Sequence, residues 1–184
     1  MTNQALIVID VINGFITEGP LSDPSIAQII EPTRQAIEKA LAEGTPVLTF
    51  RDAHDEAAAE FDAYPPHCLK GTRESQLVDE LLPYRGRLID VEKNTTNGFF
   101  AEGFQIFLRD HPEVTHYTLV GCCTDICVLQ FGVTLKTYAQ THKLPLTIQV
   151  IRDAVDTFEL PHHPKTTFHE TALAMMQAAG IRII

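Results

Sequence analysis

The stretch Val114-Thr-His-Tyr-Thr-Leu-Val-Gly121, followed at once by Cys122-Cys-Thr-Asp-Ile-Cys127, indicates the fold of this chain. A short apolar run is followed by the cysteines and then by an apolar-periodic segment, which predicts a buried strand, a tight turn and a helix. The first turn of a helix presents unpaired backbone N–H groups and the positive end of the helix dipole. A thiol at Cys127 would there be biased toward the nucleophilic thiolate, and the same N–H groups could hold an oxyanion.

Five further short apolar runs can form strands around this segment. They are Ala5–Ile9, Pro46–Phe50, Arg87–Val91, Leu146–Ile151 and Gly180–Ile184. Most are apolar on both faces, which is typical of parallel strands covered by helices on both sides. Helical patterns lie between most of them, at residues 23–42, 74–82, 103–109, 127–140 and 164–179. This alternation predicts an α/β fold, a three-layer sandwich with a central six-stranded parallel sheet, in one domain spanning residues 1–184.

The chain is acidic, and no segment suggests export or membrane insertion. Its 184 residues carry a formal net charge of -10, which argues against a nucleic-acid partner. The first apolar run has no basic residues before it and meets Asp10 and Asn13 within a few residues, so we do not expect a signal peptide. No apolar stretch approaches membrane-spanning length, and we expect a cytoplasmic protein without a membrane partner. The four cysteines match neither a disulfide framework nor a structural zinc site.

Chemically useful side chains follow the predicted strands at one edge of the sheet. Asp10, Asp52 and Lys93 come where strands end, as does the cysteine segment. Because ligands of open α/β sheets bind outside the carboxyl ends of the strands, we expect these groups to share one site. Cys127 is the candidate nucleophile, Asp10 the base that takes the thiol proton and passes it to a leaving amine, and Lys93 the cation that holds both. The ammonium favours the thiolate, whereas burial opposes it.

Each of these residues also has a simpler interpretation. A cysteine behind a strand is more often a small core residue than a catalyst. The aspartate could cap a helix, and an isolated lysine usually lies on the surface. As thiols, Cys68, Cys122 and Cys123 show no comparable pattern, and we assign their side chains no chemical role.

A second group of residues has the composition of a metal site. Asp52 and His54 are separated by one residue, and Glu60 and His67 follow in a long irregular segment. Imidazole and carboxylate together suit zinc, manganese or iron(II), and such long loops in compact domains are usually functional. The alternative is a polar surface loop whose charged side chains face water. The remaining histidines, including the pair His162-His163, have no matching partners, and we expect them on the surface.

Three motifs resemble those of the cysteine hydrolases of the isochorismatase-like superfamily, and most closely those of the nicotinamidases. They are Ile9-Asp10 followed by Phe15, Lys93 with Phe99 in KNTTNGF, and Gly121–Val128. The resemblance covers nearly the whole chain. It implies a Rossmann-like strand order, and it implies that Asp10, Lys93 and Cys127 are the catalytic residues.

The resemblance also implies contacts with the substrate. Phe15 is expected to stack on the substrate, and Tyr64 could flank an aromatic ligand, although aromatic residues near strand ends usually belong to the core. A cis peptide is implied between Cys122 and Cys123, aiming the backbone N–H groups of Cys123 and Cys127 at the oxyanion. We therefore include Cys122 and Cys123 among the substrate-binding residues.

The candidate metal ligands are similar to the metal loop of nicotinamidases, which carbamoyl amidases and isochorismatase generally lack. The matching positions are Asp52, His54, Glu60 and His67, followed by Leu69-Lys-Gly71-Thr72. The resemblance implies one divalent transition metal, zinc in the first place with manganese or iron as alternatives, which binds the pyridine nitrogen of the substrate. Two departures leave the shape of the ring pocket open: Ala53 stands where many relatives have tryptophan, and Thr95-Thr96-Asn97 replaces residues that are often aromatic or small.

The resemblance thus implies a metal-dependent amidohydrolase that converts nicotinamide to nicotinate and ammonia, in NAD salvage and pyridine nucleotide biosynthesis. The reaction would cleave a linear carboxamide C–N bond through a cysteine thioester. One alternative is a metal-free hydrolase of the same superfamily that acts on another small amide or carbamoyl compound. Others are a redox or metal-binding protein that uses Cys122, Cys123 and Cys127, and a non-catalytic binding module. Helical faces rich in Ala and Ile allow a homo-oligomer.

Overall fold

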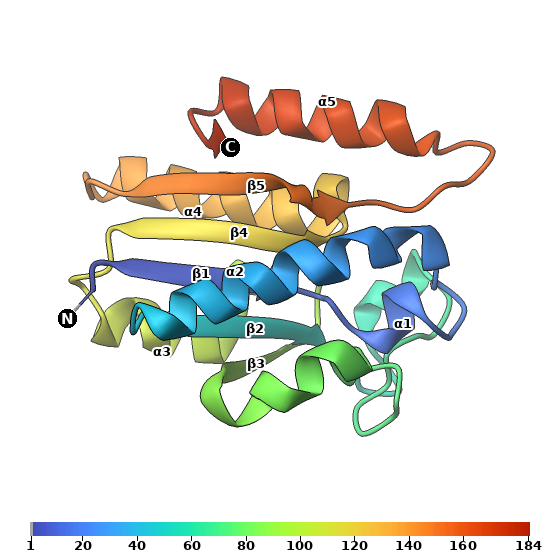
Figure 1. The fold of residues 1–184 in the computed structure, drawn as a ribbon. Helices are drawn as coiled ribbons and strands as arrows, with labels where there is room; N and C mark the ends of the chain where they lie inside the picture. The colour runs from blue at the N-terminus through green and yellow to red at the C-terminus, as the bar shows by residue number, and fades with distance from the viewer. Residues whose placement is uncertain (1) are drawn as a thin grey trace.

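A parallel sheet of six strands forms the centre of the molecule (Figure 1). The computed structural model describes residues 2–184, and the strands are β1 (Gln4–Ile9), β2 (Val47–Asp52), β3 (Ile89–Lys93), β4 (His116–Cys122), β5 (Thr147–Asp156) and β6 (Arg182–Ile183). Their order across the sheet is β3-β2-β1-β4-β5-β6, and each neighbouring pair is parallel. This is the Rossmann order. The predicted three-layer α/β sandwich with a six-stranded parallel sheet is therefore confirmed.

Helices cover both faces of the sheet, because successive side chains of a strand point to opposite sides. One face carries α1 (Asn13–Ile16), a 3-10 segment at Pro24–Ile29, α2 (Ile30–Ala42) and a 3-10 segment at Asp79–Arg87, and the other carries α3 (Glu102–Asp110), α4 (Leu129–Thr141) and α5 (Lys165–Ala178). In β1, Leu6 and Val8 face the first layer and Ile7 the second, so a hydrophobic core forms on each side. Within residues 2–184, no helix has the length and apolarity needed to cross a membrane.

Two predicted elements differ from the observed ones for physical reasons. The helix predicted at residues 74–82 is wrong, because the chain instead forms the 3-10 segment Asp79–Arg87, which continues through Pro83. Proline has no N–H to donate to an α-helical ladder, and short 3-10 turns often serve as connections. β5 continues to Asp156, beyond its predicted end at Ile151, after a register shift against β4. Such an irregularity bends a strand and re-aims the residues that follow.

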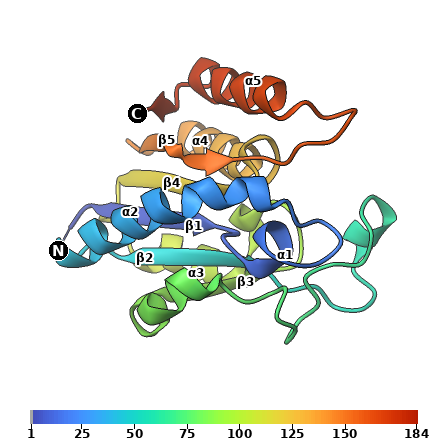
Figure 2. The ribbon, with the colours of Figure 1, turned by 45° about the vertical axis from the view of Figure 1, so that its right-hand side comes forward.

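The carboxyl ends of the strands meet at one edge of the sheet, where the long connections lie. Figure 2 shows the connection after β2 extending beyond this edge, next to α1. Its base is fixed by a parallel bridge between His54 and Leu69, and it contains one short 3-10 turn, Ala59–Asp62. The segments that follow β1, β2, β3 and β4 thus surround a common space.

Candidate active site

The cysteine segment forms a compact turn at the end of β4. A π-helical turn at Thr124–Val128 leads directly into α4, and the peptide between Cys122 and Cys123 is cis, as the resemblance predicted. The N–H groups of Ile126 and Val128 donate to the carbonyl of Cys123 at 3.2 and 3.1 Å. Gly121, with a φ of 117°, is required here, because a Cβ at this position would lie 1.9 Å from the carbonyl oxygen of Ile9. β1 and β4 can approach closely only because this residue has no side chain.

Asp10, Lys93 and Cys127 lie together at the ends of three different strands. The Nζ atom of Lys93 is 2.8 Å from Oδ2 of Asp10 and 3.9 Å from Sγ of Cys127, and it also contacts Oδ1 of Asp52. All four side chains are buried. Asp10 has a φ of 52°, in the left-handed region that non-glycine residues seldom adopt outside functional or strained positions. The structure therefore brings together the candidate nucleophile, the candidate acid–base residue and the candidate cation. It also shows a contact between Lys93 and Asp52 that the sequence did not indicate.

Burial decides the protonation of the two candidate reacting groups. It raises the pKa of the Cys127 thiol well above its usual range, and the ammonium of Lys93 opposes this only in part. The predicted bias toward the thiolate is therefore wrong, because the depth of burial outweighs the cation. Burial also raises the pKa of Asp10 to about 7, again against the effect of Lys93. Such a carboxylate can accept the thiol proton and release it near neutral pH.

Asp52, His54, Glu60 and His67 form a four-residue cluster next to Lys93. Each offers one ligand atom, and these atoms lie within 4.8 Å of one another. The two imidazole Nε2 atoms are 3.7 to 3.8 Å from carboxylate oxygens of the cluster, too far for hydrogen bonds. Oδ2 of Asp52 and both Nε2 atoms are buried without a partner. Because buried polar atoms normally have partners, this cluster has the character of a site for a shared cation.

The hydrogen bonds behind the two imidazoles favour the same interpretation. Nδ1 of His67 is 2.8 Å from the carbonyl oxygen of Pro65 and must donate to it, and Nδ1 of His54 is 3.0 Å from the side-chain oxygen of Asn94. A neutral ring of this tautomer has its lone pair on Nε2, the atom that faces the cluster. Metal-binding histidines usually donate their other N–H in this manner. Two imidazoles and two carboxylates therefore fit a divalent transition metal.

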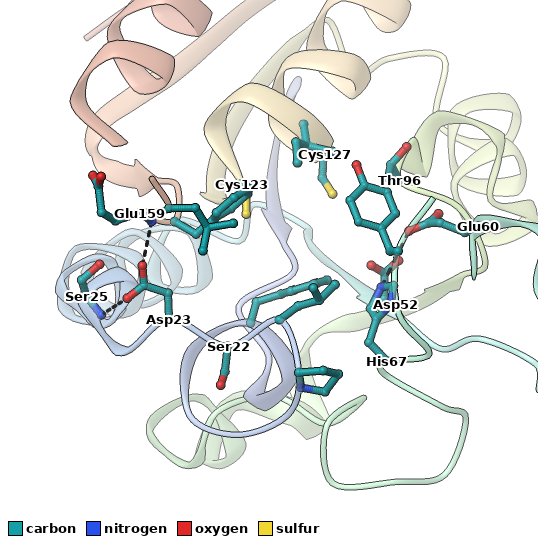
Figure 3. A pocket seen from close by; sticks show the side chains of 17 residues that line it. Ser22, Asp23, Ser25, Asp52, Glu60, His67, Thr96, Cys123, Cys127 and Glu159 are labelled. Atoms are coloured by element: carbon teal, nitrogen blue, oxygen red, sulfur yellow. Dashed lines mark hydrogen bonds and ion pairs between the residues drawn. The ribbon is translucent and has the colours of Figure 1, made fainter. Parts of the chain in front are cut away.

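A cavity of about 440 Å³ opens between this cluster and the cysteine turn (Figure 3). Its lining residues are Phe15, Pro20, Leu21, Ser22, Asp23, Ser25, Asp52, Glu60, Tyr64, His67, Thr96, Cys123, Ile126, Cys127, Phe158, Glu159 and Leu160. In Figure 3 the sulfur atoms of Cys123 and Cys127 point into this space, and Glu60 and His67 bound one side of it. A small ligand in the cavity can therefore contact a thiol and the candidate metal ligands at once.

The cavity includes Phe15, Tyr64 and Cys123, as expected, but the side chain of Cys122 lies elsewhere. It is fully buried in the core on the α2 side of the sheet, and its Sγ donates to the main-chain oxygen of Asp10 at 3.1 Å. The side chain of Cys122 therefore does not line the cavity, and the substrate-binding role expected of Cys122 through its peptide bond to Cys123 stays a prediction. The turn directs this side chain into the core, and the sequence pattern did not reveal that direction.

Sequence reasoning also missed several residues around the site. Asn94 supports His54, and nothing in its spacing marked it, although it directly follows the candidate lysine. The cavity wall at 158–160 was not anticipated. His163, expected on the surface, is only 13% exposed at its side chain, and its Nε2 lies 2.7 Å from Oδ2 of Asp125. The prediction that His163 lies on the surface is wrong, because the segment before α5 folds back onto the cysteine turn.

The family model of the isochorismatase domain matches residues 4–184. This chain belongs to the isochorismatase family. Nicotinamidase 1 of Arabidopsis thaliana is 28% identical over 211 aligned residues, which cover all of this chain and 86% of the relative. The fold and the family model therefore agree on an isochorismatase-like protein, and its relatives include a nicotinamidase.

Solved structures support the same relationship. The pyrazinamidase/nicotinamidase from Streptococcus mutans UA159 superposes with a TM-score of 0.83 at 27% identity, covering 98% of this chain and 99% of that one. The pyrazinamidase of Pyrococcus horikoshii in complex with zinc gives a TM-score of 0.81 at 25% identity, covering all of this chain and 99% of that one. A zinc complex in a similar structure agrees with the donor set described above.

Proposed function

We propose that this isochorismatase-family protein hydrolyses nicotinamide to nicotinate and ammonia with a divalent transition metal held by Asp52, His54, Glu60 and His67. One observation supports this most strongly. A buried cluster of unsatisfied metal-type ligands and a buried thiol border the same cavity, so a ring nitrogen and a carboxamide carbon can be held at the same time. Similarity to nicotinamidases and pyrazinamidases agrees with this substrate class.

The first half of the reaction forms a thioester. The thiol proton of Cys127 moves to the carboxylate of Asp10, and the sulfur attacks the carboxamide carbon, with the positive charge of Lys93 beside both groups. The carbonyl oxygen becomes an oxyanion that the backbone N–H groups of Cys123 and Cys127 stabilise. Asp10 then gives its proton to the amide nitrogen, the C–N bond breaks, and ammonia leaves.

The second half releases the acid. Asp10, again a carboxylate, takes a proton from a water molecule that attacks the thioester carbon. The tetrahedral intermediate collapses, the C–S bond breaks, and the proton on Asp10 returns to the sulfur. Nicotinate leaves and the resting thiol is restored, in agreement with the raised pKa of Cys127.

The metal would act on the ring and not on the scissile bond. When bound, it supplies a Lewis acid for the pyridine nitrogen, which anchors and orients the substrate. Phe15 and Tyr64 line the cavity beside the cluster and can pack on the faces of the ring. Zinc is our first choice, with manganese and iron as alternatives, and turnover of nicotinamide would place the protein in NAD salvage in the cytoplasm.

A panel of small amides tests this proposal. Purified protein is assayed for ammonia release from nicotinamide, pyrazinamide, benzamide and a carbamoyl compound, with and without a chelator and after metal is restored. We expect hydrolysis of the two ring-nitrogen amides, loss of activity with the chelator, and much weaker hydrolysis of benzamide. Chelator-insensitive activity on the carbamoyl compound would instead identify a metal-free hydrolase of the same family.

A further inference from the structure

One wall of the substrate cavity comes from the segment between β5 and α5, which has no role in the mechanism above. Phe158, Glu159 and Leu160 line the cavity, and Figure 3 shows Glu159 on the side away from Glu60 and His67. The segment ends in a tight turn, closed by backbone hydrogen bonds of 3.1 and 2.9 Å between Leu160 and His163. The position of this wall therefore depends on what holds His163.

Both nitrogens of the His163 ring are hydrogen-bonded to acceptors. Nδ1 lies 3.0 Å from the carbonyl oxygen of Phe158, and Nε2 lies 2.7 Å from Oδ2 of Asp125. The carboxylate of Asp125 only accepts hydrogen bonds, so Nε2 is the donor in the bond that joins the ring to the cysteine turn. The two side chains are 13% and 11% exposed, so water screens this charge-assisted hydrogen bond only weakly.

The same ring is stacked between two phenylalanines. The ring centroids of Phe158 and Phe168 each lie 3.9 Å from that of His163, with interplanar angles of 11° and 27°. Aromatic rings stacked on both faces of the imidazole fix its plane and shield it from water. His163 therefore joins three parts of the molecule: the cavity wall through Phe158, α5 through Phe168, and the cysteine turn through Asp125.

We propose that His163 is a positioning residue that latches residues 157–164 onto the cysteine turn, so that Phe158 and Leu160 form a fixed wall against the amide substrate. Asp125 lies in the same π-helical turn as Cys127, so one contact sets the distance between the wall and the nucleophile. The identity of the substrate rests on the proposed function, but the latch itself does not. Because the wall contacts substrate in the ground state and in the transition state alike, its loss raises KM and changes kcat little.

Steady-state kinetics of His163→Ala test this role, with His162→Ala as the matched control because His162 is exposed. For nicotinamide we expect KM to rise about tenfold in His163→Ala with kcat within about threefold of wild type, the size expected for one lost charge-assisted bond. His162→Ala should change neither constant. An unchanged KM in His163→Ala, or a loss of kcat alone, would overturn the latch. Partial unfolding of the variant cannot imitate the expected result, because a smaller folded fraction lowers the apparent kcat without raising KM.

The variant His163→Phe separates the contribution of aromatic stacking from the contribution of the His163 hydrogen bonds. It retains an aromatic ring between Phe158 and Phe168 but cannot donate to Asp125. We expect its KM to rise as in the alanine variant. A wild-type KM would show that packing alone holds the wall, and would overturn the role of the bond to Asp125.

Amide hydrogen exchange, measured without substrate, tests the latch independently of turnover. Exchange within residues 157–164 should be faster in His163→Ala and His163→Phe than in wild type and His162→Ala, with α2 unchanged as an internal reference. Unchanged exchange in residues 157–164 would overturn the latch. If the wild-type protein hydrolyses none of the amides, the proposed function fails, while the exchange result still decides the latch.

Discussion

A buried lysine organises the reactive residues of this protein. Lys93 lies between Asp10 and Asp52 and reaches Cys127, so it neutralises the acid–base candidate and also fixes one of the candidate metal ligands. Removing one partner of such a buried pair leaves an uncompensated charge and commonly costs about 3–5 kcal/mol. Substitutions that preserve shape are therefore the informative ones at this site.

Removal of the thiol at Cys127 should abolish turnover while the fold remains. We expect Cys127→Ala to lose at least about 10³-fold in kcat for nicotinamide, because Cys127 is the cavity thiol that Lys93 contacts beside Asp10. Cys68→Ala is the control, since that thiol is also buried but does not line the cavity. Circular dichroism checks folding. Comparable activity in the two variants would contradict the assignment of the nucleophile.

Asp10→Asn should remove proton transfer but leave the packing intact. General acid–base catalysis contributes about 10²–10⁴-fold, and we expect a kcat loss in that range with metal content unchanged. The measurement is kcat at saturating substrate together with elemental analysis. Near-normal kcat in the asparagine variant would exclude Asp10 as the proton carrier.

At the scale of single residues, the sequence predicted which side chains lie at the ends of strands, but not how deeply those side chains are buried. Asp10, Lys93 and Cys127 each follow an apolar run, and the parallel sheet brings such positions to one edge. The protonation of Cys127 depends on how deeply it lies, and the direction of the Cys122 side chain depends on the turn. The contacts of His163 form only after the segment before α5 folds back, so local sequence could not reveal them.

At the scale of elements, the irregular connection after β2 holds three of the four candidate metal ligands, His54, Glu60 and His67, next to Asp52. β2 supplies Asp52 at its end, and the bridge between His54 and Leu69 closes the base of the connection. Asn94, directly after β3, fixes the imidazole of His54. Two neighbouring strands and one loop therefore build the cluster together.

Asn94→Ala should weaken metal binding although Asn94 is not itself a candidate ligand. Groups that orient a ligating histidine typically contribute 10- to 100-fold in metal affinity, and we expect a loss of about that size, measured by chelator competition. His54→Ala should lower the metal content of the purified protein outright. Glu56→Gln is the control, an exposed acid of the same loop. Equal affinity in Asn94→Ala and wild type would contradict the tautomer assigned to His54.

Elements with strong apolar patterns were predicted well, and irregular ones were not. The helix expected at residues 23–42 is present, but it begins as the 3-10 segment Pro24–Ile29 before α2. The helix expected at residues 74–82 is replaced by a later 3-10 segment, since contacts with α2 outweigh the weak local pattern. Tertiary packing routinely overrides such local preferences.

At the scale of the whole molecule, two hydrophobic cores hold the sheet between its helical layers. Phe104 of α3 is fully buried and packs edge-on against Phe50 of β2 and Phe131 of α4, with ring centroids 5.7 and 4.9 Å apart. This aromatic cluster connects two helices to the sheet on the side opposite α2. The three-layer arrangement was predictable because apolar runs alternated with helical patterns, whereas these particular ring contacts were not.

Truncation of this cluster should destabilise the protein without touching the site. We expect Phe104→Ala to lower the free energy of unfolding by about 3–5 kcal/mol, as usual for a buried phenylalanine. Phe100 is 69% exposed, so Phe100→Ala should change the free energy of unfolding by less than about 0.5 kcal/mol. Urea unfolding of both variants gives the comparison. Similar effects in the two would contradict the described core.

The most direct test of the account is to trap the enzyme during turnover. Metal-loaded protein is mixed with excess nicotinamide and quenched in acid within a few milliseconds to seconds, and its peptides are then examined by mass spectrometry. The account predicts a nicotinoyl group on the peptide that contains Cys127, formed as ammonia is released and absent from Cys127→Ala. Ammonia release in the complete absence of this adduct, or an adduct on another side chain, would contradict it.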